Sequence, residues 1–336
     1  DLILNIPQLH NSGTIQGLSL STTGDVLQNE GTLLADTGLW LRAGQLDNRG
    51  NIAAKGQLTA NATRLSNAGR LESKSRMDLS ADETTLSGSQ IAQDALNVTA
   101  KTLNHSGQTS AAAVALKATQ NINNSGEMSG AAVALTATDS INNSGKLIAD
   151  NLALHAAQVS NSGQVQGTQA LNLQADLLEN QATAAIYTAQ DLILNIPQLH
   201  NSGTIQGLSL NATSDVLQNE GKLLADTGLV LNAQQLENRG NVAAKGALNA
   251  SAGRLNNQGV MQGLTLGIAG DVLENSGTLQ GKTLDMRGDQ VRNSGMLVAD
   301  DALRIDAGSL ATTADSTLNS KGDLQLSAKR DASLQG

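Results

Sequence analysis

Apolar and polar residues alternate along short stretches of this chain, and polar corners separate the stretches. The alternation is plain in Leu39-Trp-Leu41-Arg-Ala43, Val114-Ala-Leu116-Lys-Ala118 and Leu229-Val-Leu231-Asn-Ala233. A period of two predicts β-strands that turn one face inward. The unit returns about every 19 residues almost throughout, whereas two helices with their turns need more than about 30 residues. The pattern therefore predicts a repeat architecture built from strands.

Each unit contains one corner of the form Leu-x-Asn-x-Gly-x-[Ile/Leu/Val]. A second short strand follows the glycine, as in Gly50-Asn-Ile52-Ala-Ala54, and a third leads into the corner, as in Gln45-Leu46-Asp-Asn48. Three short strands and three turns in ~19 residues describe one rung of a parallel β-helix, whose rungs stack about 4.8 Å apart. The sequence therefore predicts an all-β fold, a parallel β-helix (solenoid) of about 17–18 rungs with three short strands per rung.

Residues 1–20 recur unchanged at 191–210. Because successive corner glycines are almost evenly spaced, ten units account for this offset. We expect residues 1–336 to form a single β-helix repeat segment, in which 1–190 and 191–336 are related by a ten-rung duplication. Residue 1 falls inside a repeat and no signal peptide opens the chain, so we expect a segment excised from a longer chain.

The corner asparagine lies two residues after an inward leucine, so it should also point inward. We expect its amide to bond to turn backbone and to the same asparagine on the neighbouring rungs, which would form a ladder. The predicted ladder residues are Asn11, Asn29, Asn48, Asn67, Asn124, Asn143, Asn161, Asn201, Asn219, Asn238, Asn257, Asn275 and Asn293.

The corner glycine is expected to adopt a positive φ, which strains any residue with a side chain. The predicted turn glycines are Gly13, Gly31, Gly50, Gly69, Gly107, Gly126, Gly145, Gly163, Gly203, Gly221, Gly240, Gly259, Gly277 and Gly295. We also expect some rungs to trade turn length between corners. The connection within residues 15–20 is shorter than that within 33–39, and the next connection should then be longer.

Two rungs lose the corner motif, one near Leu86 and one near Leu178. Decay of the repeat explains them better than a specific binding patch. In the rung that ends at Gly107, the asparagine position holds His105, which we expect to continue the polar ladder rather than bind a metal. Trp40 should face outward, and its duplicate position is Val230, which argues against an essential role in stacking on sugars.

Convergent catalytic or metal-binding residues are missing from the sequence. The four histidines, at positions 10, 105, 155 and 200, are scattered, and there is no H-E-x-x-H, no G-x-S-x-G and no glycine-rich calcium nonapeptide. Polysaccharide-active β-helix enzymes build clefts from long turn insertions, and no turn here grows by more than a few residues. We predict no catalytic residue, no metal site and no cofactor, and therefore a protein that is not an enzyme.

The amino-acid composition limits which residues can form the hydrophobic core and which classes of partner we expect. Phe is absent and aromatic residues make up 1% of the chain, so the core must be aliphatic and narrow. The 30 acidic and 21 basic residues are interspersed and give a formal net charge of −9, which argues against a nucleic-acid partner. There is no cysteine, so disulfides and thiolate chemistry are excluded. No apolar run approaches the roughly 20 residues that span a bilayer.

The run of ~19-residue units with Leu-x-Asn-x-Gly-x-[Ile/Leu] and a following Leu-x-Leu-x-Ala resembles the filamentous haemagglutinin repeats. These are carried by large exoproteins of Gram-negative two-partner secretion systems, including adhesins and contact-dependent growth-inhibition toxins. The resemblance covers essentially the whole chain and implies a right-handed β-helix that projects from the outer membrane as a stalk. It also implies a secreted, cell-surface location and, during export, an outer-membrane transporter of the two-partner type.

The leading functional hypothesis is a structural stalk that presents a distal adhesin or toxin module to target cells, whose receptor is bound by other regions. The alternative is that the repeat faces themselves bind a host glycan or receptor. A polysaccharide-active β-helix enzyme is a remote third reading. Near-identical rungs and scarce aromatic residues favour the stalk. Exposed strands at the two cut ends also predict end-to-end self-association.

Overall fold

The computed structural model describes residues 1–335, and every helix or strand in this range is a β-strand. There are 34 strands, from β1 (Leu2–Asn5) to β34 (Asp323–Ser333), and each pairs in parallel with a strand about one repeat away. The described chain contains no helix long and apolar enough to cross a membrane. The predicted parallel β-solenoid is confirmed, because equivalent positions of successive repeats pair with one another.

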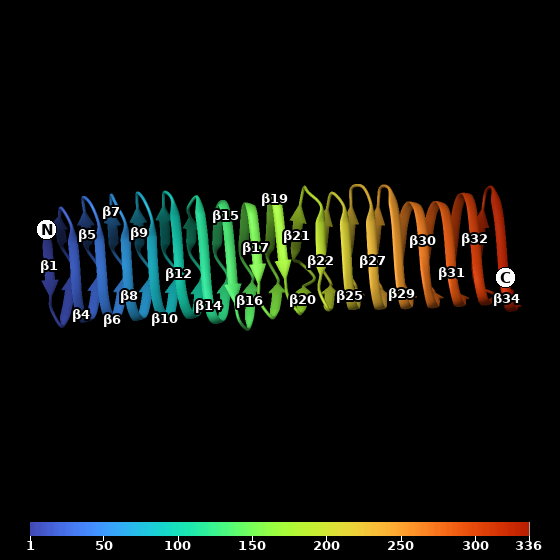
Figure 1. Ribbon diagram of the computed structural model, residues 1–336, viewed down its shortest axis with the longest axis horizontal. Helices are drawn as coiled ribbons and strands as arrows, with labels where there is room; N and C mark the ends of the chain where they lie inside the picture. The colour runs from blue at the N-terminus through green and yellow to red at the C-terminus, as the bar shows by residue number, and fades with distance from the viewer. Residues whose placement is uncertain (336) are drawn as a thin grey trace. The chain divides into compact units, whose positions relative to one another are not determined.

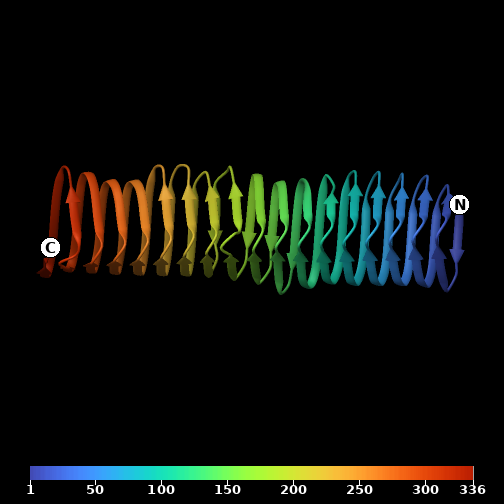
Figure 2. The ribbon, with the colours of Figure 1, turned by 180° about the vertical axis from the view of Figure 1, so that it is seen from behind.

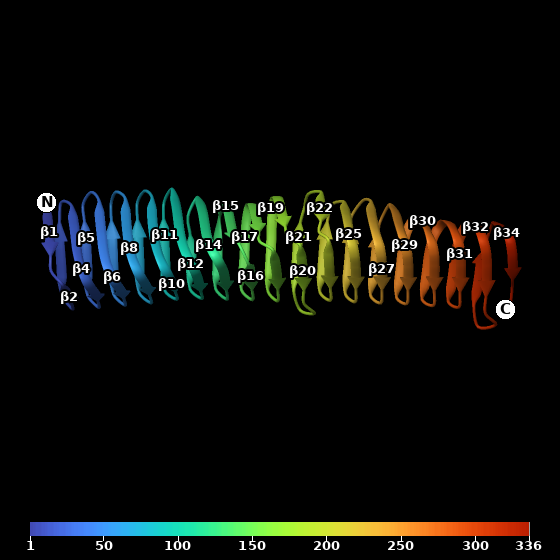
Figure 3. The same cartoon turned by 60° about the horizontal axis from the view of Figure 1, so that its bottom comes forward.

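The chain divides into two compact units, Asp1–Leu173 and Gln174–Gly336. In the first unit, coloured blue to green in Figure 1, a rung consists of β6 (Leu39–Asn48) and β7 (Asn51–Ala54). In the second, coloured yellow to red, an equivalent rung consists of β27 (Leu229–Asn238) and β28 (Asn241–Ala244). Within each unit the rungs stack one on the next, as Figure 2 shows from behind, and Figure 3 shows their corners lying in rows.

Two of the three predicted strands in a rung are joined in most rungs. The pairing of β4 (Leu20–Asn29) with β6 stops at Gly24↔Ala43 and resumes at Val26↔Gln45, so one residue on each strand is left unpaired at a bend. The ten-residue strand is therefore two straight segments that meet at a corner. Where Pro197 stands at this corner, the two segments are the separate strands β22 (Leu192–Asn195) and β23 (Gln198–Asn201), because proline lacks the N–H that pairing requires.

The core of each unit consists of side chains at equivalent positions of successive rungs, which stack one above the other. Leu20, Leu39 and Leu58 pair in register and are completely buried, and Leu41 and Ala60 form a second column beside them. Side chains on the alternate positions point outward, as does Trp40, which has 45% of its surface exposed. Each rung thus buries its aliphatic face against the rungs on either side, and an isolated rung could not do so.

The short rung of Ile15 and the longer rung of Leu33 differ at a single corner. Leu20 follows Ile15 by five positions, whereas Leu39 follows Leu33 by six, yet the pairs Leu20↔Leu39 and Leu27↔Leu46 are both in register. In this rung the next connection does not compensate, and the short rung simply lacks one residue. The expected trade occurs instead in the rung of Ser110, where the step to Ala113 is one residue shorter than in the preceding rung and the step from Ala118 to Asn121 is one residue longer. Gly17 permits the tight corner, because a Cβ atom there would lie 2.8 Å from the carbonyl oxygen of Ser19.

Candidate functional site

The corner asparagines lie inside the solenoid, and each has at most 5% of its surface exposed. Along each run of consecutive asparagines, the Nδ2 amide donates to the Oδ1 of the asparagine one rung further on, at 2.6–2.8 Å. Asn48 is typical, because its Nδ2 also lies 3.3 Å from the carbonyl oxygen of Gly50 and 3.1 Å from that of Arg70. The amides thus satisfy one another and the turn backbone, as a buried polar group requires.

Asn180 occupies the same position in the second unit, although its corner lacks the glycine. It has 1% of its surface exposed and donates to Asn201 Oδ1 at 2.8 Å. The corner that follows it is two residues longer than usual, because β20 (Leu177–Asn180) ends five positions before β21 (Ala185–Thr188) begins. The Leu-x-Asn part of the corner motif is present at Leu178 and Asn180, but the glycine is replaced by Ala182, so the full motif does not predict this residue.

Steric contact between neighbouring corners explains the turn glycines. No glycine in residues 1–335 has a positive φ, so the expected left-handed conformation is wrong. In twelve of the fourteen predicted glycines, an added Cβ atom would instead lie under 3.0 Å from the carbonyl oxygen of the corner glycine one rung earlier. Such a distance requires the backbone to move, so glycine is needed because the corners stack closely.

The remaining two predicted glycines have different surroundings, and one further glycine belongs to the stack. A Cβ atom on Gly203 would meet the carbonyl oxygens of Gln181 and Ala184, because the corner of the preceding rung is longer. On Gly13 it would meet nothing within 4 Å. Gly88 stacks between Gly69 and Gly107 like the other corner glycines. It is absent from the predicted set because Leu86 replaces the asparagine of the corner motif in its rung.

The asparagine ladder is interrupted in the rung of β10 (Met77–Leu86) and β11 (Ser89–Ala92). Leu86 takes the asparagine position, between Asn67 and His105 on the neighbouring rungs. Thr84 and Gln90 take positions that are leucine in the preceding rung, and both are buried. The Thr84 hydroxyl and the Gln90 Nε2 atom have no hydrogen-bond partner. This rung therefore buries two polar groups at positions that hold leucine in the preceding rung.

His105 begins the next stretch of the ladder and has 1% of its surface exposed. Its Nδ1 lies 2.7 Å from Asn124 Oδ1, and its Nε2 lies 3.0 Å from the hydroxyl of Thr109. That hydroxyl lies 2.9 Å from Gln90 Oε1. Burial lowers the pKa of His105, and the hydrogen bond to Asn124 opposes this shift. No group of three or more potential metal ligands occurs in the described chain.

The number of hydrogens in this chain of contacts determines which groups donate. Neutral His105 has one N–H, which Asn124 Oδ1 accepts from Nδ1, so Nε2 can only accept. The single hydroxyl hydrogen of Thr109 then faces two acceptors, His105 Nε2 and Gln90 Oε1. If the Gln90 amide were flipped, so that its nitrogen and oxygen changed places, it would donate to Thr109 and Thr109 to His105. All donors would then point the same way as in the asparagine ladder.

The pKa of His105 predicts a loss of stability in acid. Because burial lowers this pKa in the folded chain, the unfolded chain takes up the proton at a higher pH. The stabilisation should be complete above about pH 6.5, the ordinary value for histidine, and should be lost as the pH falls through the folded pKa. His105→Asn should remove this part of the pH dependence. Thermal melts of both proteins between about pH 8 and about pH 4 test it, and parallel curves would contradict it.

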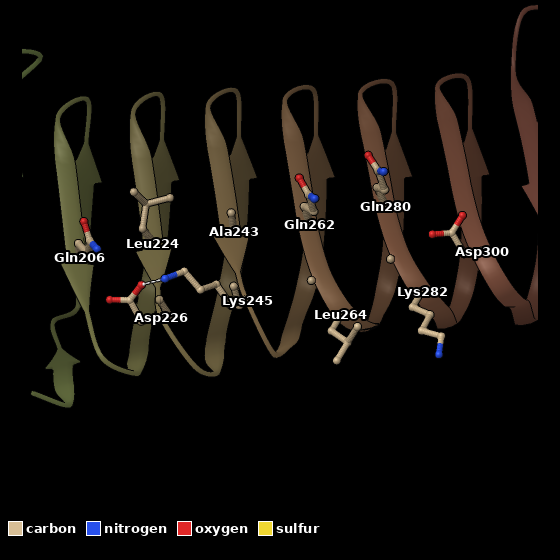
Figure 4. A pocket seen from close by; sticks show the side chains of 14 residues that line it. Gln206, Leu224, Asp226, Ala243, Lys245, Gln262, Leu264, Gln280, Lys282 and Asp300 are labelled. Atoms are coloured by element: carbon tan, nitrogen blue, oxygen red, sulfur yellow. Dashed lines mark ion pairs between the residues drawn. The ribbon is translucent and has the colours of Figure 1, made fainter.

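An open groove of about 790 Å³ lies on the outer surface of the second unit (Figure 4). It crosses β24 (Thr204–Gly207), β26 (Lys222–Ala225), β28, β30 (Val260–Asn275), β31 (Thr278–Asn293) and β32 (Met296–Thr312). Outward side chains at one register position form its floor, namely Gln206, Leu224, Ala243, Gln262 and Gln280. Asp226 and Lys245, 2.6 Å apart, lie along one side. Sequence reasoning missed this groove.

Comparison with known proteins gives the repeat class. The haemagglutinin repeat family matches residues 8–87 and 147–206. The deoxyribonuclease CdiA of Dickeya dadantii (strain 3937) is 41% identical over 110 residues, which are 32% of this chain and 3% of that protein. The tRNA nuclease CdiA of Escherichia coli O6:K15:H31 (strain 536 / UPEC) is 44% identical over 92 residues, 26% of this chain and 3% of that protein.

The chain thus spans about 3% of the length of these curated relatives, and the similarity lies in the repeats. No solved structure matches the chain. Proteins with these repeats, including the CdiA relatives, are secreted, cell-surface exoproteins of two-partner secretion systems, and the repeats form their filament stalk. The matched parts of this chain, residues 8–87 and 147–206, are therefore filamentous haemagglutinin-type repeats similar to those of such exoproteins.

Proposed function

We propose that this repeat region holds a distal adhesin or toxin module away from the cell that produces it, and so presents the module to target cells. The observation that carries the proposal is the regularity of the rungs, whose outward loops are only a few residues long. The names of the relatives, deoxyribonuclease CdiA and tRNA nuclease CdiA, favour a toxin module over an adhesin. We assign no enzymatic activity to the repeats themselves.

The contacts between rungs suit a load-bearing element. Backbone hydrogen bonds of a parallel sheet run from one rung to the next, and the asparagine amides add side-chain bonds in the same direction. A pull along the stack therefore acts on many hydrogen bonds in each rung at once. Because each rung packs mainly on its neighbours, stability grows with every rung that is added.

The same construction suits export through an outer-membrane transporter of the two-partner type, which we propose as the partner during secretion. The chain has no cysteine, so no disulfide can form before passage. A rung that emerges can pair at once with the exposed edge of the rung before it. End-to-end association of the isolated segment through such edges stays a prediction.

The alternative function is direct binding of a receptor by the repeat faces, and the groove in the second unit is the observation that favours it. The two functions differ in where the receptor site lies. We expect this chain alone, at about micromolar concentration, not to bind target cells that the parent exoprotein binds. Flow cytometry with both labelled proteins tests this expectation. Equal binding by the repeat chain alone would replace the stalk by an adhesin.

A further inference from the structure

Two neighbouring corners along the groove in the second unit are one residue shorter than the corner just before them. Between the paired positions Ala243 and Ala247 lie three residues, but between the equivalent Gln262 and Thr265 lie only two. The next rung, from Gln280 to Thr283, is equally short. These two shorter corners, at Leu264 and Lys282, and the longer corner at Lys245 all line the groove, as Figure 4 shows.

Two glutamine side chains in the rungs with the shorter corners are exposed and make no hydrogen bond within the described chain. These are Gln262 and Gln280, which pair in register on β30 and β31 and so lie one rung apart. Each offers two N–H donors and an acceptor oxygen. Small and apolar residues surround them, among them Ala243, Gly263 and Leu264, and Leu264 has 55% of its surface exposed. The floor of the groove thus combines amide groups that have no hydrogen-bond partner with apolar patches.

The charged residues along the groove are already neutralised by one another. Asp226 pairs with Lys245 at 2.6 Å, Lys282 with Asp301 at 3.2 Å, and Asp300 with Lys321 at 2.5 Å. The groove therefore presents no excess of either sign to a ligand. A polyanion or a polycation would gain little from it, and a neutral ligand fits best.

The backbone N–H and C=O groups of the floor strands have no hydrogen bonds to offer a ligand, because each strand pairs with neighbours on both sides. An extended peptide binds best at a free sheet edge, where it gains main-chain hydrogen bonds, and the face of a sheet offers none. A ligand in this groove must be recognised by side-chain amides and apolar patches alone. Sugar rings match both, because their hydroxyls donate and accept while their ring faces are apolar. We propose that this groove binds a neutral oligosaccharide laid across successive rungs.

The duplicated segment of the first unit provides an internal comparison. It has the same outward residues at the start of the column, Gln16, Leu34 and Ala53. The next residue in that column is Glu72, which accepts hydrogen bonds from Arg70 at 2.7 Å and pairs with Lys74 at 2.5 Å. Bonds from Lys74 and then Arg70 lower the pKa of Glu72, so a charged cluster takes the place of Gln262. The neutral amide floor is thus particular to the second unit.

Titration of the whole chain with neutral hexasaccharides tests the proposal. The probes are a β-1,4-glucan and a β-1,4-linked N-acetylglucosamine hexamer, followed by calorimetry or by amide shifts. We expect saturable binding of at least one probe, and a loss of about tenfold or more in affinity for Gln262→Glu, which introduces the residue of the first unit. Gln280→Ala should weaken the same binding, and the matched variant Gln16→Glu should not.

Three results would overturn the proposal: no saturable binding of either neutral probe, equal binding by Gln262→Glu and the natural chain, or tighter binding of a polyuronate hexamer. Each variant replaces an exposed side chain, so equal melting temperatures should show that folding is unchanged. The stalk proposal does not depend on this result, because it is tested by the binding of whole target cells.

Discussion

Gly240→Ala should destabilise the second unit by about 3 kcal/mol or more, the largest effect that we expect from a single methyl group in this chain. A Cβ atom at this position would lie under 3.0 Å from the carbonyl oxygen of Gly221 and from the backbone of Glu220. The surroundings cannot yield by rotating a side chain, because both contacts are with backbone. The corner would have to separate from the one before it, which stretches the hydrogen bond from Asn241 N to Gly221 O, now 2.8 Å long.

Gly228→Ala is the matched control in the same unit. The nearest atom to a Cβ there is the carbonyl oxygen of Ala247, at 3.7 Å, which is an ordinary contact, and its φ is not positive. We expect this variant to keep the stability of the natural chain or to gain slightly from the lower entropy of the unfolded chain. Denaturant midpoints, followed by circular dichroism, decide the matter. Equal midpoints for the two alanine variants would contradict steric stacking of the corners.

Asn238→Leu should destabilise the second unit by about 1–3 kcal/mol, although leucine has nearly the same size. Asn238 accepts a hydrogen bond from Asn219 at 2.8 Å and donates to Asn257 at 2.7 Å and to the carbonyl of Val260 at 3.1 Å. Leucine would leave a donor on one neighbouring rung and an acceptor on the other without a buried partner. Such unpaired groups lose their hydration on folding and gain nothing in return.

Glu220→Ala is the control for the ladder, because Glu220 lies beside the same corner but points outward. Its partners are surface groups, among them Arg239 at 3.2 Å, and both side chains are about half exposed. Exposed pairs of this kind contribute little, so the midpoint should shift by no more than about 0.5 kcal/mol. Similar losses for Asn238→Leu and Glu220→Ala would argue that the amides do not stabilise the corners.

The fold was accessible from the sequence because one pattern recurs with a nearly constant period. Alternation in residues 39–43 predicts a strand, and the spacing of the corners predicts that equal positions stack. The parity of Leu46 and Asn48 likewise predicts the inward asparagine, and the structure places Asn48 in the core. Each inference concerns a property that one rung already contains.

The properties that sequence reasoning missed depend on two rungs at once. From the sequence, Gly50 is expected to be a turn glycine with positive φ. The true reason for glycine is steric, because a Cβ atom at this position would collide with the carbonyl oxygen of Gly31 one rung earlier. The groove at Gln262 is formed by outward side chains of several rungs, and only the pairing of the rungs places these side chains side by side. Asn180 lies outside the predicted ladder for a simpler reason, because its altered corner lacks the glycine of the corner motif although its amide still donates to Asn201.

Deletion of residues 11–200 from the parent exoprotein tests the account most directly. It joins His10 to Asn201 and restores a natural sequence, because 1–20 and 191–210 are identical. Ten rungs, each about 4.8 Å, are removed while the inward and outward positions of the remaining strands are kept. We expect export and binding to target cells to persist with a shorter reach, whereas a deletion five residues smaller should disturb folding at the seam. Loss of target-cell binding with intact export and folding would contradict the stalk, because the receptor site would then lie within these rungs.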